Sequence, residues 1–205
     1  MVGVRIEQLA IGADASSWAD AGFAGDAGGA RVGEVALHFT EGEGIRAWRL
    51  EGIDGEIDGL PVSPVEVVPG EAEHANGVTR IDHIVVLTPD LERTTRALEV
   101  VGTERRRVRE VDTDDGPLRQ GFFRLGEVIL EVIGSPGVAT EGPSTLWGVT
   151  FVVDDIDASA AYFGERTSPV KDAVQPGRRI TTLRHRDLGL SVRTALISPH
   201  VRAER

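Results

Sequence analysis

Hydrophobic and polar positions after residue 79 follow an order of one strand, one helix and three strands. The β-branched run over residues 81–88 predicts a strand that ends before Pro89. Apolar residues at helical spacing predict a helix over 91–101, which Gly102 stops. Three further strands are predicted over residues 105–111, 118–125 and 127–133.

The same order returns in the last third of the chain. A strand is predicted over 147–153, then a helix over 156–163 that Asp154 and Asp155 can cap, then strands over 170–174, 180–183 and 190–197. When the two copies are aligned, Gly148 lies over His83 and Thr194 over Glu131. The offsets in numbering are nearly equal (148 − 83 = 65 and 194 − 131 = 63). The chain therefore contains two consecutive copies of one supersecondary unit.

The segment 1–60 is interpreted as a shortened third copy. A strand from Ile6, a helix over 15–23 and a strand over 33–39 follow the same order, but too few residues separate Phe23 from Gly33 for both intervening strands. Residues 45–50 predict one further strand, the stub of a fourth unit. Residues 61–78 are rich in proline and acidic residues and predict a linker or covering loop.

Tandem units of this kind resemble the vicinal-oxygen-chelate superfamily, which includes glyoxalases, bleomycin-resistance proteins and extradiol dioxygenases. The strings that carry the resemblance are DHIVVLTPDL at 82–91, FRLGEVILE at 123–131 and FVVDDI at 151–156. The resemblance implies an α+β, glyoxalase-like fold of paired βαβββ modules around a cavity, with an abbreviated module before them. The expected boundaries are 1–60 for the abbreviated module, 61–78 for the linker, and 79–138 and 139–205 for the two full modules.

The resemblance also implies where a metal would bind. Metalloenzymes of this superfamily take a His from the first strand and a Glu from the last strand of their units. The first full module has both, His83 and Glu131, whereas the second has Gly148 and Thr194. Two ligands rarely hold a catalytic divalent metal. The expected cofactor is therefore none, or one divalent metal held in part by His83 and Glu131.

Two ways to complete such a site stay open. His185 is the nearest further histidine, although it lies in a turn-like segment. Alternatively, the shortened module could pair with the first full one, so that Gln8 and His38 face a common cup with His83 and Glu131.

Strand alternation places Glu131 on one face with Ile129 and Ile133. A carboxylate among apolar residues must be paired, hydrogen-bonded or protonated. Arg124 is the obvious ion-pair partner, and its guanidinium could also bind a carboxylate on a ligand. Further residues expected to line the cavity and contact a ligand are Phe122, Trp147, Thr150 and Thr194.

Composition narrows the classes of function. Lys and Arg total 22 against 33 Asp and Glu, so the net charge is −11, which disfavours binding to nucleic acid. The absence of cysteine excludes disulfides and thiolate metal sites. No apolar run approaches the length of a membrane span, and the N-terminus lacks the features of a signal peptide, so a cytoplasmic protein without a membrane partner is expected.

Three functions fit these observations. The first is a glyoxalase-like enzyme, of the lyase or isomerase type or related to the dioxygenases, that acts on a small oxygenated metabolite. His83 and Glu131 would then be acid/base groups or partial metal ligands. The alternative is a non-catalytic protein that binds or sequesters a small molecule, as antibiotic-binding members of the superfamily do. A third option is a scaffold for oligomerisation, and a homodimer is compatible with all three.

Overall fold

A computed structural model describes residues 3–114, 116–137 and 139–200. The largest element is an eight-stranded mixed sheet. Its strands, in spatial order, are β12 (Lys171–Asp172), β13 (Arg179–Thr182), β14 (Arg193–Ile197), β11 (Thr145–Val153), β7 (Val78–Leu87), β10 (Val128–Gly134), β9 (Gly116–Leu125) and β8 (Arg105–Thr113).

The sheet consists of the two repeated units side by side. One is β7, helix α2 (Leu91–Val100), β8, β9 and β10, and the other is β11, helix α3 (Ile156–Phe163), β12, β13 and β14. The first and last strands of each unit pair in parallel, and the two units join through the antiparallel pair β7–β11. The predicted α+β fold of paired βαβββ modules is thus confirmed.

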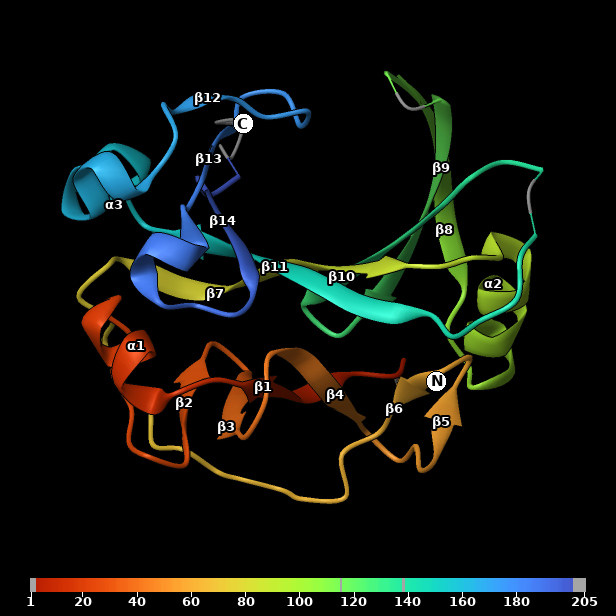
Figure 1. Cartoon of the computed structure of the whole chain (residues 1–205), viewed down its shortest axis with the longest axis horizontal. Coiled ribbons are helices and arrows are strands. Elements are labelled where there is room, and N and C mark those ends of the chain that lie inside the picture. The colour runs from red at the N-terminus through yellow and green to blue at the C-terminus, as the bar shows by residue number, and fades with distance from the viewer. Residues whose placement is uncertain (1–2, 115, 138, 201–205) are drawn as a thin grey trace, which may run out of the picture.

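Figure 1 shows the sheet bent into a U, which we call the cup. The central strands form its floor, β12 to β14 rise as one arm, and β8 and β9 rise as the other. Helices α2 and α3 lie outside the arms. Each begins at an aspartate cap: Asp90 accepts from the backbone N–H of Arg93, and Asp155 accepts from those of Asp157 and Ala158.

The two central strands carry β-bulges at matching places. Their pairing skips Asp82 on β7 and Trp147 on β11, and the offset in numbering between these two positions is again 65 (147 − 82 = 65). A third shift skips Thr79, near the start of β7. Between the bulges, Ile84 is paired with Val149, which has the same offset. The two modules are therefore related by an approximate two-fold axis at this pair, and each bulge re-aims a side chain on its strand.

A second, four-stranded sheet is built from the N-terminal part of the chain. Its order is β2 (Gly29–Val32), β3 (Val35–Thr40), β1 (Ile6–Gly12) and β4 (Gly44–Leu50), with helix α1 (Ala15–Asp20) after β1. Strand β1 is parallel to β3 and antiparallel to β4, as β7 is to β10 and β11. Strand β4 therefore has the place of the first strand of a further unit, and only β2 lies between α1 and β3. The module boundaries given above stay a prediction.

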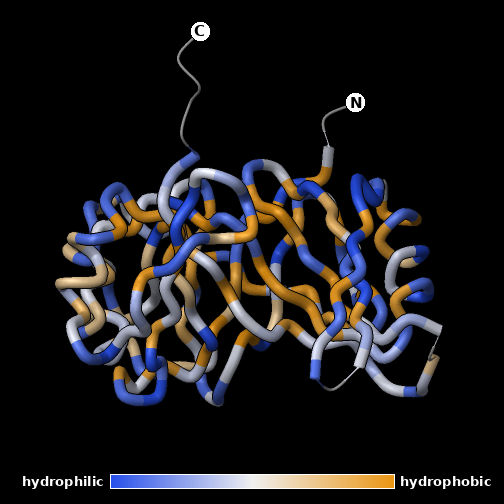
Figure 2. The backbone as a smooth tube through the Cα atoms, turned by 90° about the horizontal axis from the view of Figure 1, so that it is seen from above, coloured by the Kyte–Doolittle hydropathy of each residue, from blue (hydrophilic) through white to orange (hydrophobic). Residues whose placement is uncertain are grey.

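The main core lies between the two sheets, on the side of the large sheet away from the cup (Figure 1). Phe151 of the floor packs against Phe23 and Trp18, with ring centroids 5.2 and 6.3 Å apart. Trp18, Phe151 and most inward-facing strand residues are fully buried. Figure 2 shows the apolar residues concentrated along the strands in the middle of the molecule, with polar residues in the peripheral loops. Burial of these aromatic and aliphatic residues is the main force that joins the N-terminal sheet to the cup.

The segment after the short hairpin β5 (Glu56–Ile57) and β6 (Leu60–Pro61) crosses the outer face of the N-terminal sheet. The side-chain amide of Gln8 donates to the carbonyl of Val65 at 2.8 Å and accepts from the N–H of Val67 at 2.9 Å. Arg31 donates to the carbonyl of Pro69. Within the described residues, no helix has the length and apolar character that crossing a membrane would need.

Candidate functional site

Asp82 and His83 point toward one another although they are neighbours in the chain. In a regular strand, adjacent side chains point to opposite faces. The bulge at Asp82 interrupts this alternation, and Asp82 Oδ2 lies 2.8 Å from Nδ1 of His83. When a neutral imidazole donates its Nδ1 proton to a carboxylate, the lone pair on Nε2 is left free.

Nε2 of His83 faces Glu131, whose Oε2 is 3.9 Å away. Strand β10 places Ile129 beside His83 and Glu131 beside Val85, so the imidazole and the carboxyl lie diagonally on one face of the sheet. The other carboxyl oxygen of Glu131 accepts a 2.7 Å hydrogen bond from Gln120. Both His83 and Glu131 keep 15% of their side chains exposed. The structure thus brings the two groups together where a ligand in the cup can reach them.

The buried guanidinium of Arg178 holds Asp82 in place. Its Nη1 donates to Asp82 Oδ1 at 2.7 Å, and its Nε donates to the carbonyl of Ser198 at 2.8 Å. Arg178 is 1% exposed and Asp82 is 5% exposed. Because each buried charge offsets the desolvation of the other, the pair keeps Asp82 ionised behind His83.

The pKa values of the two carboxyl groups beside His83 are shifted in opposite directions, although burial acts to raise both. It raises the pKa of Glu131 above the ordinary value, and the positive charges of His83 and Arg109 oppose this only in part. Burial also acts to raise the pKa of Asp82, but the hydrogen bond from His83 and the charge of Arg178 outweigh it, so that this pKa is lowered. Two carboxyls with divergent pKa values can serve as an acid and as a fixed anion.

Phe122 and Arg124 lie on β9, on the same face as Glu131. Phe122 is the cross-strand partner of Glu131, and Arg124 is the partner of Ile129. However, Nε of Arg124 donates to the carbonyl of Gly126 at 2.8 Å. The predicted ion pair between Arg124 and Glu131 is therefore wrong, because Gln120 takes that place and Arg124 turns to the end of its hairpin.

Thr150 and Trp147 lie in the half of the floor that the second module supplies. Thr150 is the cross-strand partner of His83. Together with Trp147 it lines a cavity of 170 Å³. Trp147 is 41% exposed, whereas Phe151, on the same strand, is fully buried in the core.

The residue that matches Glu131 in the second module is Ala195 rather than Thr194. On β10, Ile129 pairs with His83, and Glu131 lies two residues after Ile129. On β14, Arg193 pairs with Gly148, and Ala195 lies two residues after Arg193. The alignment of Thr194 with Glu131 is thus wrong by one residue. The Thr194 side chain is 1% exposed, and its hydroxyl donates to a backbone carbonyl of its own segment.

A metal centre does not fit these residues. Gly148 and Ala195 bring no side-chain donor atom that could complete a site with Nε2 of His83 and the carboxyl of Glu131. Across residues 3–114, 116–137 and 139–200, no three His, Asp or Glu side chains converge to hold a metal ion. Catalytic metal sites generally need three protein ligands.

The other proposed ligands lie elsewhere. His185 lines the 170 Å³ cavity with Thr150. Gln8 and His38 share the outer face of the N-terminal sheet, because Gln8 pairs with Ala36 and His38 with Ala10. The idea that Gln8 and His38 face a common cup with His83 is wrong, since two sheets and the core between them separate the two faces.

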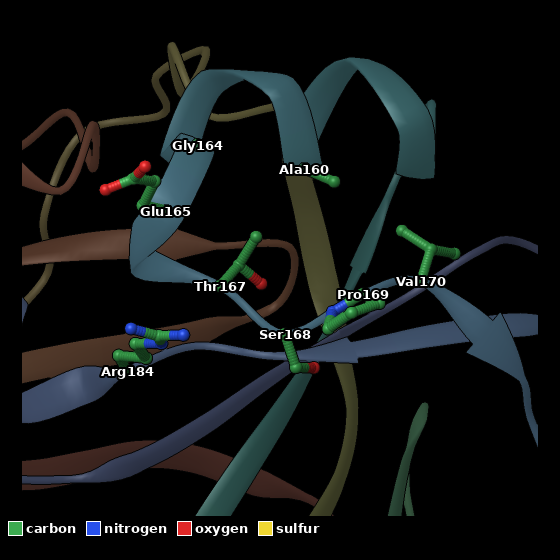
Figure 3. Close-up of a pocket in the computed structure, with 8 residues that line it drawn as sticks. All are labelled: Ala160, Gly164, Glu165, Thr167, Ser168, Pro169, Val170 and Arg184. Carbon is green, nitrogen blue, oxygen red and sulfur yellow. The ribbon is translucent and has the colours of Figure 1, made fainter.

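A larger hollow of 480 Å³ lies between α3, the 3₁₀ helix Gly164–Arg166 and the segment after β13. Figure 3 shows Glu165 and Arg184 on one side of it and the small side chains of Thr167 and Ser168 along its wall. Thr167 and Ser168 are hydrogen-bonded to Thr181. Neither His83 nor Glu131 lines this hollow, so it is separate from the arrangement described above.

Sequence reasoning overlooked most of the residues that support His83. Arg178 is followed directly by Arg179, but nothing local links Arg178 to Asp82, which is far away in the sequence. The role of Gln120 follows from the register of β9 with β10, which places it opposite Ile133. An Asp directly before a His on a strand was the one available signal.

Comparison with known proteins rests on structure alone. No family model matches the chain, and no curated protein matches it in sequence. Among solved structures, a mutant of 4-hydroxymandelate synthase from Streptomyces coelicolor matches with a TM-score of 0.65 and 15% identity, over 98% of this chain and 94% of that one. A variant of homoprotocatechuate 2,3-dioxygenase from B. fuscum matches with a TM-score of 0.57 and 16% identity, over 96% of this chain and 72% of that one.

The chain has the vicinal-oxygen-chelate fold. Both matches extend over nearly the whole chain, so the N-terminal sheet takes part in the likeness as well as the cup. At these identities the likeness shows the fold alone. Activity within a vicinal-oxygen-chelate fold has to be argued from the residues in the cup.

Proposed function

We propose that the protein binds a small oxygenated metabolite in the cup, and that His83 and Glu131 transfer a proton on it without a metal, as in a lyase or isomerase. The observation that supports this proposal is the Asp82–His83–Glu131 arrangement. A buried, ionised Asp82 fixes the imidazole, and Nε2 of His83 faces a carboxyl whose pKa is raised. These are the properties expected of a general base and a general acid that work as a pair.

The chemistry proposed is proton transfer at a carbon next to a carbonyl group. Nε2 of His83 takes the proton, and the electrons of the C–H bond move onto the carbonyl oxygen. That oxygen receives a proton from the carboxyl of Glu131, which gives an enol. The imidazolium of His83 then returns the proton, or a solvent proton exchanged for it, to carbon, while the enol proton goes back to Glu131. Return to the same carbon regenerates the substrate, whereas return to another carbon of a conjugated enol completes an isomerisation. Asp82 stabilises the imidazolium that forms in between.

A second candidate is binding without catalysis. It is favoured by Gly148 and Ala195, which leave the second half of the floor without acid/base groups. In this case the cup would act by sequestering its ligand through apolar and polar contacts.

Hydrogen–deuterium exchange separates the two candidates. Chelator-treated protein is incubated in D₂O with enolisable carbonyl compounds such as pyruvate, acetoacetate and dihydroxyacetone, and exchange at carbon is followed by NMR. We expect exchange that depends on protein and falls by about 100-fold in His83→Gln. The matched control is His38→Gln, on the outer face of the N-terminal sheet. Saturable binding with no exchange above that of free solution would favour the second candidate.

A further inference from the structure

Arg193 is stacked on Trp147 at the floor of the cup. The guanidinium carbon lies 4.8 Å from the centroid of the indole ring. Trp147 has the bulge position that matches Asp82, so the second module presents an aromatic face where the first presents a carboxylate. A guanidinium in cation–π contact with a ring still has N–H groups that can donate to an acceptor. Arg193 takes part in none of the ion pairs found among the described residues.

The cavity beside Arg193 adjoins the His83–Glu131 pair. Thr150, on its wall, is the cross-strand partner of His83, and Val85 is the strand neighbour of Glu131. Its volume is 170 Å³. At about 30 Å³ for each water molecule, this is room for about six waters, and so for a compact group of few atoms. Polar groups on the remaining wall come from Thr182 and His185.

Gly148, which has no side chain, packs closely against Arg193. A Cβ built on Gly148 would lie 3.0 Å from the carbonyl oxygen of Arg193 and 3.4 Å from its Cβ. A side chain at position 148 would therefore press on the strand that carries Arg193. In the first module the matching position holds His83. The second module thus has room for Arg193 at the position where the first module has the side chain of His83.

The cup also carries positive charge in a chain whose net charge is −11. In the first module, Arg107 lies over the ring of Phe122 at 5.8 Å, and the charge of Arg109 partly opposes the rise that burial causes in the pKa of Glu131. In the second module the pKa of His185 is lowered, first by burial and then by the charges of Arg193 and Arg186, which outweigh the opposing charge of Asp187. The charges of Arg193 and Arg186 thus outweigh that of Asp187 at His185, on the wall of this cavity, and this balance favours an anion there.

We propose that this cavity is a carboxylate subsite, in which Arg193 binds the acid group of the substrate and turns its adjacent carbon toward His83. The proposal rests on one part of the function proposed above, namely that the cup binds the substrate. It narrows the substrate class to small carboxylic acids that carry a carbonyl group, such as 2-oxo and 3-oxo acids. Thr150 and His185 supply hydrogen-bonding groups on either side of the acid group.

Tryptophan fluorescence provides the test. Trp147 is the exposed tryptophan, whereas Trp18 and Trp48 are fully buried. The protein is titrated with pyruvate, acetoacetate and benzoate at constant ionic strength, and with the neutral amide of each. We expect saturable changes with the carboxylates and none with the amides. In Arg193→Gln we expect affinity for the carboxylates to fall by at least about tenfold, with partial recovery in Arg193→Lys.

Arg184→Gln is the matched control, because Arg184 lines the separate hollow in Figure 3 and should not affect the titration. NMR titration of His185 gives an independent readout, since a bound carboxylate should raise the pKa of its imidazole. The proposal is overturned if the amides bind as well as the acids, if Arg193→Gln binds normally, or if no acid binds at millimolar concentration. His83→Gln should keep the binding and lose only the exchange, so failure of the subsite and failure of the catalytic proposal are distinguishable.

Discussion

Asp82 and Trp147 have matching bulge positions on the two central strands and support different side chains. Asp82 holds the imidazole of His83 at 2.8 Å, and Trp147 supports the guanidinium of Arg193 at 4.8 Å. The duplicated backbone thus carries different groups in its two halves. One half has the groups of a proton-transfer site, and the other has the groups of an anion site.

The buried pair of Arg178 and Asp82 should matter for stability as well as for the site. Arg178→Met leaves the Asp82 carboxylate buried without its partner, and we expect the free energy of unfolding to fall by about 3 kcal/mol. Denaturant unfolding measures this. Arg179→Met is the control, because Arg179 and its partner Asp157 are largely exposed. That variant should change stability much less than Arg178→Met does, because solvent screens an exposed ion pair. Equal effects of the two substitutions would contradict the buried role of Arg178.

His74 should make stability sensitive to mild acid. Its Nδ1 accepts from the N–H of Ala24 at 3.0 Å, and Nε2 lies 3.0 Å from the carbonyl of Arg31, so the folded protein holds the neutral ring. Burial lowers the pKa of His74, and the hydrogen bond to Arg31 opposes this only in part. The unfolded chain therefore binds the proton first, and stability should decline as the pH falls from about 7.5 to 5.5.

His74→Gln should flatten this decline, because an amide can accept from Ala24 and donate to Arg31 without titrating. Denaturant midpoints across the pH range provide the measurement. An unchanged slope in the variant would show that another group is responsible.

Asp58 connects the N-terminal part of the chain to the cup. Its carboxylate accepts from Arg93 and Thr94 of α2 and from the hydroxyl of Ser144. Burial acts to raise the pKa of Asp58, but these hydrogen bonds outweigh it and keep the group ionised. Asp58→Asn should cost about 2 kcal/mol of unfolding free energy, because an amide cannot accept all of these hydrogen bonds.

The backbone of Asp58 is in the left-handed region, with φ of 52°, which asparagine tolerates, so that substitution adds no backbone strain. The exposed Asp54, two residues before β5, supplies the control Asp54→Asn, for which no measurable change is expected. A loss of stability that is the same in both variants would contradict this role of Asp58.

Metal content tests the ligand set directly. We expect purified protein to contain no stoichiometric divalent metal, and its Tm to stay the same after treatment with a chelator, since His83 and Glu131 lack further ligands among the described residues. Elemental analysis of the wild type beside His83→Ala checks this. Stoichiometric metal that disappears in His83→Ala would show that these residues do hold an ion.

Much of the fold could be predicted because the repeat is visible in local patterns. The strands around His83 and Glu131 are short runs of β-branched and other apolar residues, and Gly102 and Asp155 mark helix ends. The two-residue period of a strand predicts the face that Glu131 shares with Ile129. Such features depend only on residues close in the chain.

The supports of the site could not be predicted in this way. A bulge at Asp82 changes which face its side chain takes, and no local pattern marks it. The one-residue error at Thr194 arose because short strings can be aligned in two registers, and a slip of one residue exchanges the faces of a strand. The contact of Arg178 with Asp82 and the stacking of Arg193 on Trp147 are tertiary.

The protonation of the His83 ring tests the central claim most directly. Long-range ¹⁵N–¹H NMR near neutral pH reports which ring nitrogen carries the proton. If Asp82 orients the ring as a base, the neutral form will carry its proton on Nδ1 and leave Nε2 free, and Asp82→Asn will weaken this preference. A neutral ring protonated on Nε2, or a preference that Asp82→Asn leaves unchanged, would contradict the account.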